Sequence, residues 1–452
     1  MPESHPDSRF IRDLGDGLLL RHATPADADA LSEFNSRVHS DEGWDQPEAI
    51  VAEWTRDLLT RPHPTFSPGD FTVVEDTRNG QIISSCNLIS QTWTYDGIPF
   101  GVGRIELVGT HPDYRRRGLI RAQFEALHAW SAARGELVQG ITGIPNYYRQ
   151  FGYEMCLALS GSRSGFEPHV PTLKDDQPEP FQVRPASEAD LPFIMGVAAH
   201  AARRYLVTEN LDEAVWRYEL NGRSPGNAHH RILRIIQTPD GEPVGFLAHP
   251  GIVWGNRQFA TRYELAPGVS WLAVTSSVIR YLWATGQANA AREHTAEKPR
   301  ECKGFTFMLG AEHPVYRAIP DQLPRAYPPY AWYIRVPDLP GFIRHIAPVL
   351  EARLAESVLP GYTGELKLNF YRSGLRLAFE NGKLAAAEDW PEADFRKSSA
   401  DFPDLSFLHL VFGHRSVDEL KHIFADCGAR EPAAAALAAL FPRRASCVWP
   451  VA

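Results

Sequence analysis

Residues 108–121 combine the residue types and the spacing that can hold a phosphate group. An apolar stretch leads into a short turn with three consecutive arginines and Gly118, and residues 119–130 then carry apolar side chains at helical spacing. The first turn of a helix has free N–H groups, and the positive end of the helix dipole attracts an anion. Gly118 lets the backbone approach a ligand, and the arginines add charged hydrogen bonds. The segment therefore predicts a phosphate site; the alternative is a basic helix start that only faces water.

This turn resembles the acetyl-CoA pyrophosphate loop of the GNAT superfamily of N-acetyltransferases. The superfamily pattern is Gln/Arg-x-x-Gly-x-Gly/Ala; Arg115-x-x-Gly118 fits its first part, whereas Ile120 stands at the last position. A bulky aliphatic residue there is usual in the multi-domain branch typified by the enhanced-intracellular-survival acetyltransferases. The resemblance implies acetyl-CoA as co-substrate, with no metal. The residues assigned to acetyl-CoA are Val108, Gly109, Thr110, Arg115, Arg116, Arg117, Gly118, Leu119, Ile120, Arg121, Gly143, Ile144 and Asn146.

A tyrosine that follows the next expected strand (138–144) matches the proton donor of these enzymes. The pattern Tyr-x-x-Phe-Gly-Tyr selects Tyr148 rather than Tyr147. A phenol with a pKa near 10 keeps its proton at neutral pH and can give it to a departing thiolate whose conjugate acid has a pKa near 8.5. For Tyr147 and Tyr153, packing in an aromatic cluster is the simpler interpretation.

Two carboxylates are candidates for the base that receives a proton from the amine. In the resembling enzymes the C-terminal carboxylate of the chain reaches the active site, and here that group belongs to Ala452, where an aromatic residue is found in those enzymes. The rival is Glu106, which strand alternation places on the same face as Val108 and Thr110. A surface carboxylate paired with Arg104 or a neighbour is the other interpretation of Glu106. The terminus ranks slightly ahead.

An acidic loop with a tryptophan is the candidate for acceptor binding. Asp41, Glu42 and Trp44 could hold a cation by charge and by cation–π contact, although acidic loops are usually just solvated. The resemblance implies acetyl transfer to a primary amine of an aminoglycoside, a polyamine or a lysine. Two alternatives stay open: a lipid-binding protein that uses the GNAT folds as a scaffold, and a peptide N-acyltransferase with a longer acyl-CoA.

The composition is that of an ordinary globular protein. Hydrophobic residues make up 44% and charged residues 22% of the chain. Its 452 residues are enough for two to four domains. The formal charge of −9 argues against nucleic acid as a partner. No apolar run approaches the ~18 residues of a membrane helix, and no signal segment is evident. The five cysteines form no Cys-x-x-Cys pair, so we expect neither disulfides nor zinc. We expect a cytoplasmic protein that can form a homo-oligomer.

The chain divides into three expected segments with an α/β (α+β) fold. Residues 18–31 and 181–194 share one layout, in which an arginine ends a strand, Thr or Ser caps a helix and Asp lies in its first turn. Two tandem GNAT folds are therefore expected, at 1–168 and 180–335, and the second lacks the arginine turn. Residues 338–452, with a helix at 339–359 and an Asn381-Gly382 hairpin, resemble the sterol-carrier-like domain that closes enhanced-survival proteins.

Overall fold

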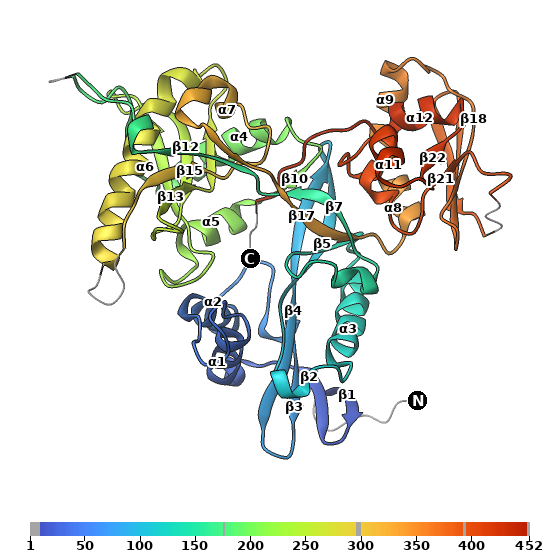
Figure 1. The fold of residues 1–452 in the computed structure, drawn as a ribbon, viewed down its shortest axis with the longest axis horizontal. Coiled ribbons are helices and arrows are strands. Elements are labelled where there is room, and N and C mark those ends of the chain that lie inside the picture. Colours follow the sequence, from blue (N-terminus) through green and yellow to red (C-terminus); the bar gives the residue numbers. More distant parts are fainter. Residues whose placement is uncertain (1–9, 175–176, 295–299, 392–394, 450–452) are drawn as a thin grey trace.

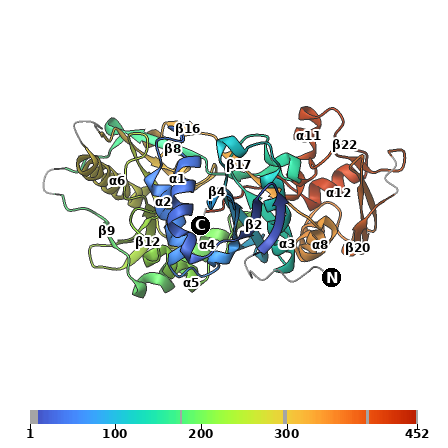
Figure 2. The same ribbon diagram turned by 90° about the horizontal axis from the view of Figure 1, so that it is seen from below.

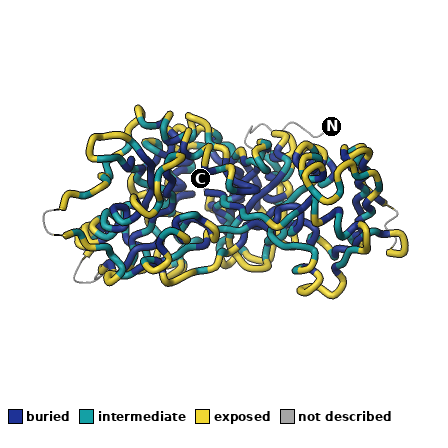
Figure 3. The backbone as a smooth tube through the Cα atoms, turned by 90° about the horizontal axis from the view of Figure 1, so that it is seen from above, coloured by how far each residue is buried: buried dark blue, intermediate teal, exposed yellow. Residues whose placement is uncertain are grey.

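The computed structural model describes residues 10–174, 177–294, 300–391 and 395–449. Three groups of elements surround a pair of long central strands, β4 and β5 (Figure 1). Seen from below, the three groups follow one another along the long axis of the molecule (Figure 2). Buried backbone positions gather inside each group, and exposed positions lie mainly at its outer turns (Figure 3). The mixed α/β class expected from the sequence is confirmed.

The first sheet runs in the order β1-β2-β3-β4-β5-β6-β17-β7, with β10 paired to β4. Helices α1 and α2 lie on one side of the β4–β5 pair and α3 on the other (Figure 1). Each side has its own apolar cluster, one with Phe34 and Leu58 and the other with Phe124 and Leu127. The elements are β1 Phe10–Gly15, β2 Leu18–His22, α1 Ala28–Val38, α2 Ala49–Thr60, β3 Phe71–Asp76, β4 Gln81–Tyr95, β5 Ile98–Thr110, α3 Leu119–Ala133, β6 Val138–Ile141, β7 Glu154–Leu159, β10 Val207–Glu209 and β17 Tyr330–Arg335.

The second group contains two sheets, in the orders β14-β12-β11-β9 and β13-β15-β8-β16. Its longest helix is α6. The elements are β8 Ser162–Phe166, β9 Gln182–Pro185, α4 Leu191–Ala202, α5 Glu213–Asn221, β11 Ile232–Gln237, β12 Pro243–His249, β13 Arg257–Ala260, β14 Arg262–Leu265, α6 Trp271–Glu293, β15 Gly304–Phe307, α7 Val315–Ala318 and β16 Arg325–Tyr327.

The repeated layout found in the sequence has one physical basis in both copies. Asp27 binds Arg21 at 2.7 Å and also accepts a bond from the backbone N–H of Thr24 at the start of the helical segment. Asp190 and Arg184 form the same pair, also at 2.7 Å. One carboxylate thus ties the end of a strand to the start of a helix in each copy.

Three strands cross the linear division of the chain. Strand β17 lies between β6 and β7 of the first sheet, and β10 extends the same sheet next to β4. In return, β8 pairs with β15 and β16 in the second group. The division at 168, 180 and 335 stays a prediction, and the sheets interleave across it.

The third group is a sheet in the order β20-β19-β18-β21-β22 covered by helices. The single helix expected at 339–359 is instead two helices, because Pro348 lacks the N–H that a continuing helix needs. The hairpin at Asn381 and Gly382 is confirmed, with φ of 51° and 78°. The elements are α8 Leu339–His345, α9 Ala347–Glu356, β18 Gly364–Asn369, β19 Gly374–Glu380, β20 Lys383–Asp389, β21 Ala400–Asp401, α10 Leu408–Val411, α11 Val417–Ile423, β22 Gly428–Ala429 and α12 Ala433–Leu440.

Among the described residues, no helix has both the length and the apolar composition of a membrane span. The five cysteines are all free. No group of three His, Cys, Asp or Glu side chains within the described ranges is arranged to hold a metal ion.

Candidate active site

Strand β5 contains a bulge at the position predicted to meet the thioester. Ser85 pairs with Gly109 and Asn87 pairs with Glu106, so between these pairs one residue of β4 faces two of β5. Leu107, inside the bulge, has a φ of 51°. The bulge turns Leu107 toward the cluster of α1 and α2, and Val108 toward the cluster of α3.

The bulge corrects the expectation that Glu106, Val108 and Thr110 share a face. Thr110 is opposite Ser84 and Glu106 is opposite Asn87, and these partners lie an odd number of residues apart on β4. Glu106 and Thr110 therefore point to opposite sides of the sheet. Simple alternation fails here because the sequence gives no indication of the extra residue.

Strand β5 has a free edge next to its bulge. Strand β5 pairs with β6 only at residues 102–104, and β6 ends at Ile141. Within the described chain, the β6-facing edge of residues 105–110 carries no strand partner. Its backbone N–H groups can therefore bind an extended ligand as an added strand would.

The free edge leads directly to the N-terminus of α3, which has the features of an anion cradle. Gly118 is the N-cap residue with a φ of 77°, no side chain caps the helix, and open space surrounds the glycine. The preceding Arg116 also has a left-handed backbone, with a φ of 65°. The first turn holds no acidic residue, so the free N–H groups of a fifteen-residue helix face outward. The exposed arginines around it are Arg115, Arg116, Arg117 and Arg121.

Aromatic rings support two of these arginines. The Arg117 guanidinium lies 4.8 Å from the ring centre of Tyr114, and that of Arg121 lies 5.4 Å from the ring centre of Phe151. No acidic side chain pairs with Arg115, Arg116, Arg117 or Arg121 in the described structure. Their charge is thus available to an anionic ligand.

Tyr148 belongs to the same apolar cluster as Val108 and is only 3% exposed. Phe124 stacks on it with ring centres 5.9 Å apart, and Tyr333 of β17 meets it edge-on at 5.4 Å. A methyl group added at Gly143 would lie 3.9 Å from its hydroxyl. Burial raises the pKa of Tyr148 well above its usual value, and the nearby charge of Glu106 acts in the same direction.

The loop after β6 is held in place by β17, a strand that sequence reasoning did not connect to it. The Tyr330 hydroxyl donates to the Gly143 carbonyl and the Tyr333 hydroxyl to the Ile144 carbonyl, both at 3.2 Å. Ile144 remains 56% exposed, and Asn146 has a φ of 64°. The loop thus presents an apolar side chain and a strained backbone beside the free edge of β5.

Glu106 forms an ion pair with Arg104, as its interpretation as a paired carboxylate predicted. Arg104 binds it at 2.5 Å, and the Glu106 side chain is 13% exposed. The structure adds His39, which follows α1 and whose Nδ1 lies 3.0 Å from the Asn35 carbonyl oxygen. Burial lowers the pKa of His39, whereas the charge of Glu106 and the Val108 carbonyl act against this. A single histidine at a helix end carries no pattern in the sequence that could have indicated this.

The other candidate base, Ala452, lies outside the described residues. The described tail, residues 445–449, runs parallel to β10: Leu206 donates to the Ala445 carbonyl and Cys447 to the Val207 carbonyl. The Trp449 N–H donates to Oε2 of Glu209 at 2.7 Å. Because β10 is antiparallel to β4, the tail advances from the level of Tyr95 toward that of Trp93.

The three acceptor candidates differ in their surroundings. Trp44 packs edge-on against His111, 4.5 Å away, at the entry to the arginine turn. Asp41 and Glu42 are exposed, and no ion pair involves them among the described residues. Trp44 therefore places this loop next to the arginine turn, whereas Asp41 and Glu42 face solvent.

Residues 20–156 match the family described as an acetyltransferase (GNAT) domain. No curated protein matches the sequence. A GCN5-related N-acetyltransferase from Kribbella flavida is similar in structure, with 16% identity, a TM-score of 0.62, and coverage of 96% of this chain and 98% of that chain.

Two further solved structures are similar over nearly the whole chain. A probable N-acyltransferase from Enterococcus faecalis V583 has 15% identity, a TM-score of 0.63 and coverage of 95% and 97%. Eis1 from Mycobacterium abscessus has 13% identity, a TM-score of 0.55 and coverage of 96% and 99%. At these identities the similarity establishes a shared fold. The chain contains a GNAT acetyltransferase domain, and the enzyme is an acyltransferase.

Proposed function

We propose that this protein is an N-acetyltransferase that moves an acetyl group from acetyl-CoA to a primary amine of a cationic acceptor. The single observation that carries the proposal is the free edge of β5 leading to the uncapped N-terminus of α3. An extended pantetheine arm needs backbone N–H groups along its length, and a pyrophosphate needs an anion site at its end. In this chain the strand edge with free N–H groups leads directly to the anion site at the helix N-terminus.

The residues around this line fit acetyl-CoA. Val108, Gly109 and Thr110 would bind the pantetheine arm and the thioester carbonyl through their backbone. The arginine turn and α3 would bind the pyrophosphate, through the set Arg115, Arg116, Arg117, Gly118, Leu119, Ile120 and Arg121. Gly143, Ile144 and Asn146 would border the arm on the other side. Acetyl-CoA, when bound, supplies the activated acetyl carbon.

Tyr148 would act as the general acid. The acceptor nitrogen forms a bond to the acetyl carbon while the bond from that carbon to sulfur breaks, and the thiolate receives a proton from the Tyr148 hydroxyl. The raised pKa of Tyr148 supports this role because the phenol stays protonated until a basic thiolate forms beside it.

A base must also take a proton from the amine, and the proposal keeps two candidates. The Ala452 carboxylate ranks first, supported by the direction of the tail as far as Trp449. Glu106 ranks second because Arg104 already engages it. His39, beside Glu106 and the Val108 carbonyl, could relay the proton. The acceptor amine would approach past Asp41, Glu42 and Trp44.

The enhanced-survival type is the subfamily we propose, with a catalytic GNAT domain at 1–168, a second GNAT-like domain at 180–335 and a sterol-carrier-like domain at 338–452. The second copy supports one cofactor site per chain. Its strand β14 leads to α6, whose cap is Ser270, through a turn without arginine. Aminoglycosides, polyamines and lysine side chains are the acceptors to test first.

A thiol-release assay with acetyl-CoA and a panel of these amines tests the proposal. We expect turnover with at least one cationic amine, and Arg116→Ala should weaken acetyl-CoA binding about tenfold, with a smaller salt dependence. Arg12→Ala, which removes an exposed arginine outside the cradle, is the control. Unchanged affinity in Arg116→Ala would place the phosphate elsewhere. Adding residues after Ala452 should abolish turnover if the terminus is the base; full activity would assign the role to Glu106.

A further inference from the structure

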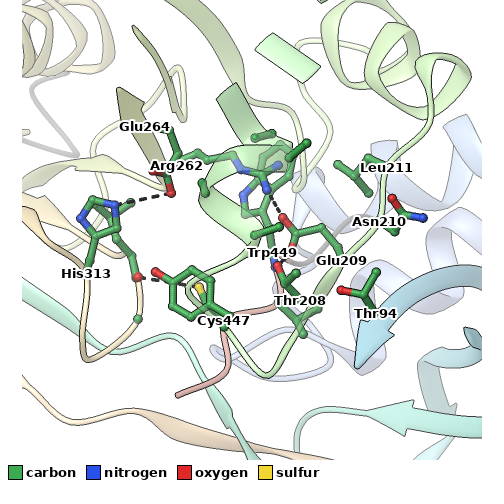
Figure 4. A pocket seen from close by; sticks show the side chains of 18 of the residues that line it. Thr94, Thr208, Glu209, Asn210, Leu211, Arg262, Glu264, His313, Cys447 and Trp449 are labelled. Atoms are coloured by element: carbon green, nitrogen blue, oxygen red, sulfur yellow. Dashed lines mark hydrogen bonds and ion pairs between the residues drawn. The ribbon is translucent and has the colours of Figure 1, made fainter. Parts of the chain in front are cut away.

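A large cavity lies away from the candidate active site, between the second group and the C-terminal tail. It has a volume of ≈ 540 Å³, within the range of small-molecule sites. Strand β14, helix α4 and residues 447–449 of the tail line it, together with Thr94 at the tip of the β4–β5 pair. Figure 4 shows Glu264 and His313 on one side, Thr208 and Glu209 on another, and Arg262 extending between them.

Every carboxylate that lines this cavity already holds an arginine. Glu209 pairs with Arg262, and Oε2 of Glu209 also accepts from Trp449 and Thr208. Glu264 binds Arg204 at 2.5 Å. The remaining carboxylate is Asp96, which binds Arg353 at 3.0 Å and also pairs with Arg444. The acidic groups are thus neutralised, although the protein as a whole carries a formal charge of −9.

The cavity keeps positive charge beyond these pairs. Arg203 and Arg231 also line it, and neither forms an ion pair within the described residues. Arg231 donates instead to the carbonyls of Ala228 and His230. The balance of the walls therefore favours an anion.

Among these cations, Arg262 is the best placed to bind an anion. Its guanidinium lies 4.9 Å from the Trp216 ring centre and 4.6 Å from that of Trp449, which fixes its position. Nη2 pairs with Glu209, and Nη1 is buried without a hydrogen-bond partner in the described chain. Burial lowers the pKa of Arg262 to about 10, so it is still cationic at neutral pH.

Helix α4 gives the cavity an apolar patch, beside polar residues such as Thr261 and Asn210 elsewhere in the wall. The patch consists of Met195, Ala198 and Ala202 of α4, with Leu211 in the same apolar cluster. A ligand that satisfies the whole cavity needs a charged acceptor at one end and a hydrocarbon body at the other.

We propose that this cavity binds a small amphipathic carboxylate, with its carboxylate on Arg262 and its hydrocarbon body against α4. A guanidinium has five N–H donors, so Arg262 can hold the ligand and Glu209 together. The inference does not depend on acetyl transfer, because it concerns a separate cavity.

Isothermal titration calorimetry of the full chain with decanoate tests this, with decanol and inorganic phosphate as comparison probes. We expect one decanoate per chain, bound at least tenfold more tightly than decanol or phosphate. Equal binding of decanol would show that charge is not recognised, and equal binding of phosphate would show that the apolar wall plays no part. Either result would overturn the proposal.

Two variants locate the site. Ala198→Phe fills the cavity without removing a charge and should weaken decanoate binding at least tenfold, whereas His200→Phe adds the same ring to an exposed position of the same helix and should leave it within twofold. Arg262→Gln should weaken decanoate more than decanol; its melting temperature reports whether it folds. Decanoate that binds Ala198→Phe normally would lie elsewhere, for example in the third group, and the inference would be wrong.

Discussion

Tyr148 illustrates how surroundings select the chemistry of one side chain. The neighbouring Tyr147 and Tyr153 are also aromatic alcohols within the same cluster. The hydroxyl of the fully buried Tyr153 forms a hydrogen bond with Nε2 of His128 at 2.8 Å, so it is engaged. Within the described residues the Tyr148 hydroxyl has no such partner, and a proton there is free to move to a ligand.

Replacing Tyr148 by Phe should lower kcat about 10²-fold or more while changing the acetyl-CoA dissociation constant little, because the ring packing is kept and only the proton donor is lost. Stopped-flow or steady-state thiol release measures kcat, and equilibrium dialysis measures affinity. Since its pKa is raised, Tyr148 keeps its proton through pH 10, so kcat of the wild type should not fall between pH 8 and pH 10 through this group.

Tyr147→Phe is the matched control and should retain turnover within a few-fold. Equal losses in both variants would indicate damage to the aromatic cluster and remove Tyr148 as the acid.

At the scale of elements, α1 and β5 meet at a position that tolerates only glycine. A Cβ on Gly109 would lie 2.5 Å from Cγ1 of Val38, the last residue of α1. Gly109 thus has two tasks, since it is also part of the strand proposed to bind the pantetheine arm. The same close approach sets His39, the next residue, beside Val108 and Glu106.

Gly109→Ala should destabilise the protein by about 1–3 kcal/mol, because the branched Val38 side chain cannot move aside freely. Differential scanning fluorimetry should show a lower melting temperature, and the double variant Val38→Ala, Gly109→Ala should recover most of it. Gly196→Ala, at an exposed site of α4 with no atom within 4 Å, is the control and should be neutral or slightly stabilising. An unchanged melting temperature in Gly109→Ala would refute the steric account.

Much of the arrangement at this scale could be predicted from local patterns. The strand before the arginine turn, helix α3 and the Asn381-Gly382 hairpin all follow from residues close in sequence. The bulge at Leu107 could not be predicted, since an extra residue leaves no mark on composition. The hydrogen bonds from β17 to the loop at Gly143 join residues far apart in sequence, and periodicity does not predict such contacts. Ala452 itself lies outside the described residues.

At the scale of the whole molecule, buried polar contacts join the three groups. Asp57 of α2 accepts bonds from the Ser224 N–H at 2.8 Å and from Nδ2 of Asn227 at 2.7 Å, both in the second group. Glu154 of β7 binds Arg149 at 2.6 Å and lies 3.7 Å from Nε2 of His409 in α10 of the third group. Contacts of this kind fix relative position because each leaves an unsatisfied group when broken.

Glu154→Gln should reduce stability at pH 7 and matter less in acid. Burial alone would raise the pKa of Glu154, but hydrogen bonds from His409 and Arg149 lower it to about 2. A lowered folded pKa stabilises the protein fully above the unfolded value of about 4.5, and this contribution is lost as the pH falls from about 4.5 toward 2. After allowance for the exposure of Arg149, we expect a loss of about 1–2 kcal/mol at pH 7.

Melting temperatures of the wild type and Glu154→Gln from pH 7 down to pH 3 measure this difference. Glu33→Gln, which removes one partner of a surface pair with Arg37, should have a much smaller effect. A gap between wild type and Glu154→Gln that stays constant or widens in acid would contradict the assignment.

The place of β17 between β6 and β7 has a consequence for the order in which the protein is made. A ribosome releases β6 and β7 long before residues 330–335, so the first sheet stays incomplete while the second group is synthesised. During that interval two strand edges lack the partner that later separates and satisfies them, a state prone to wrong pairing. The hydroxyl that bonds the loop at Gly143 and the Tyr333 ring against Tyr148 also arrive with β17. The proposed active site is therefore completed late in synthesis, although its most recognisable residues emerge first.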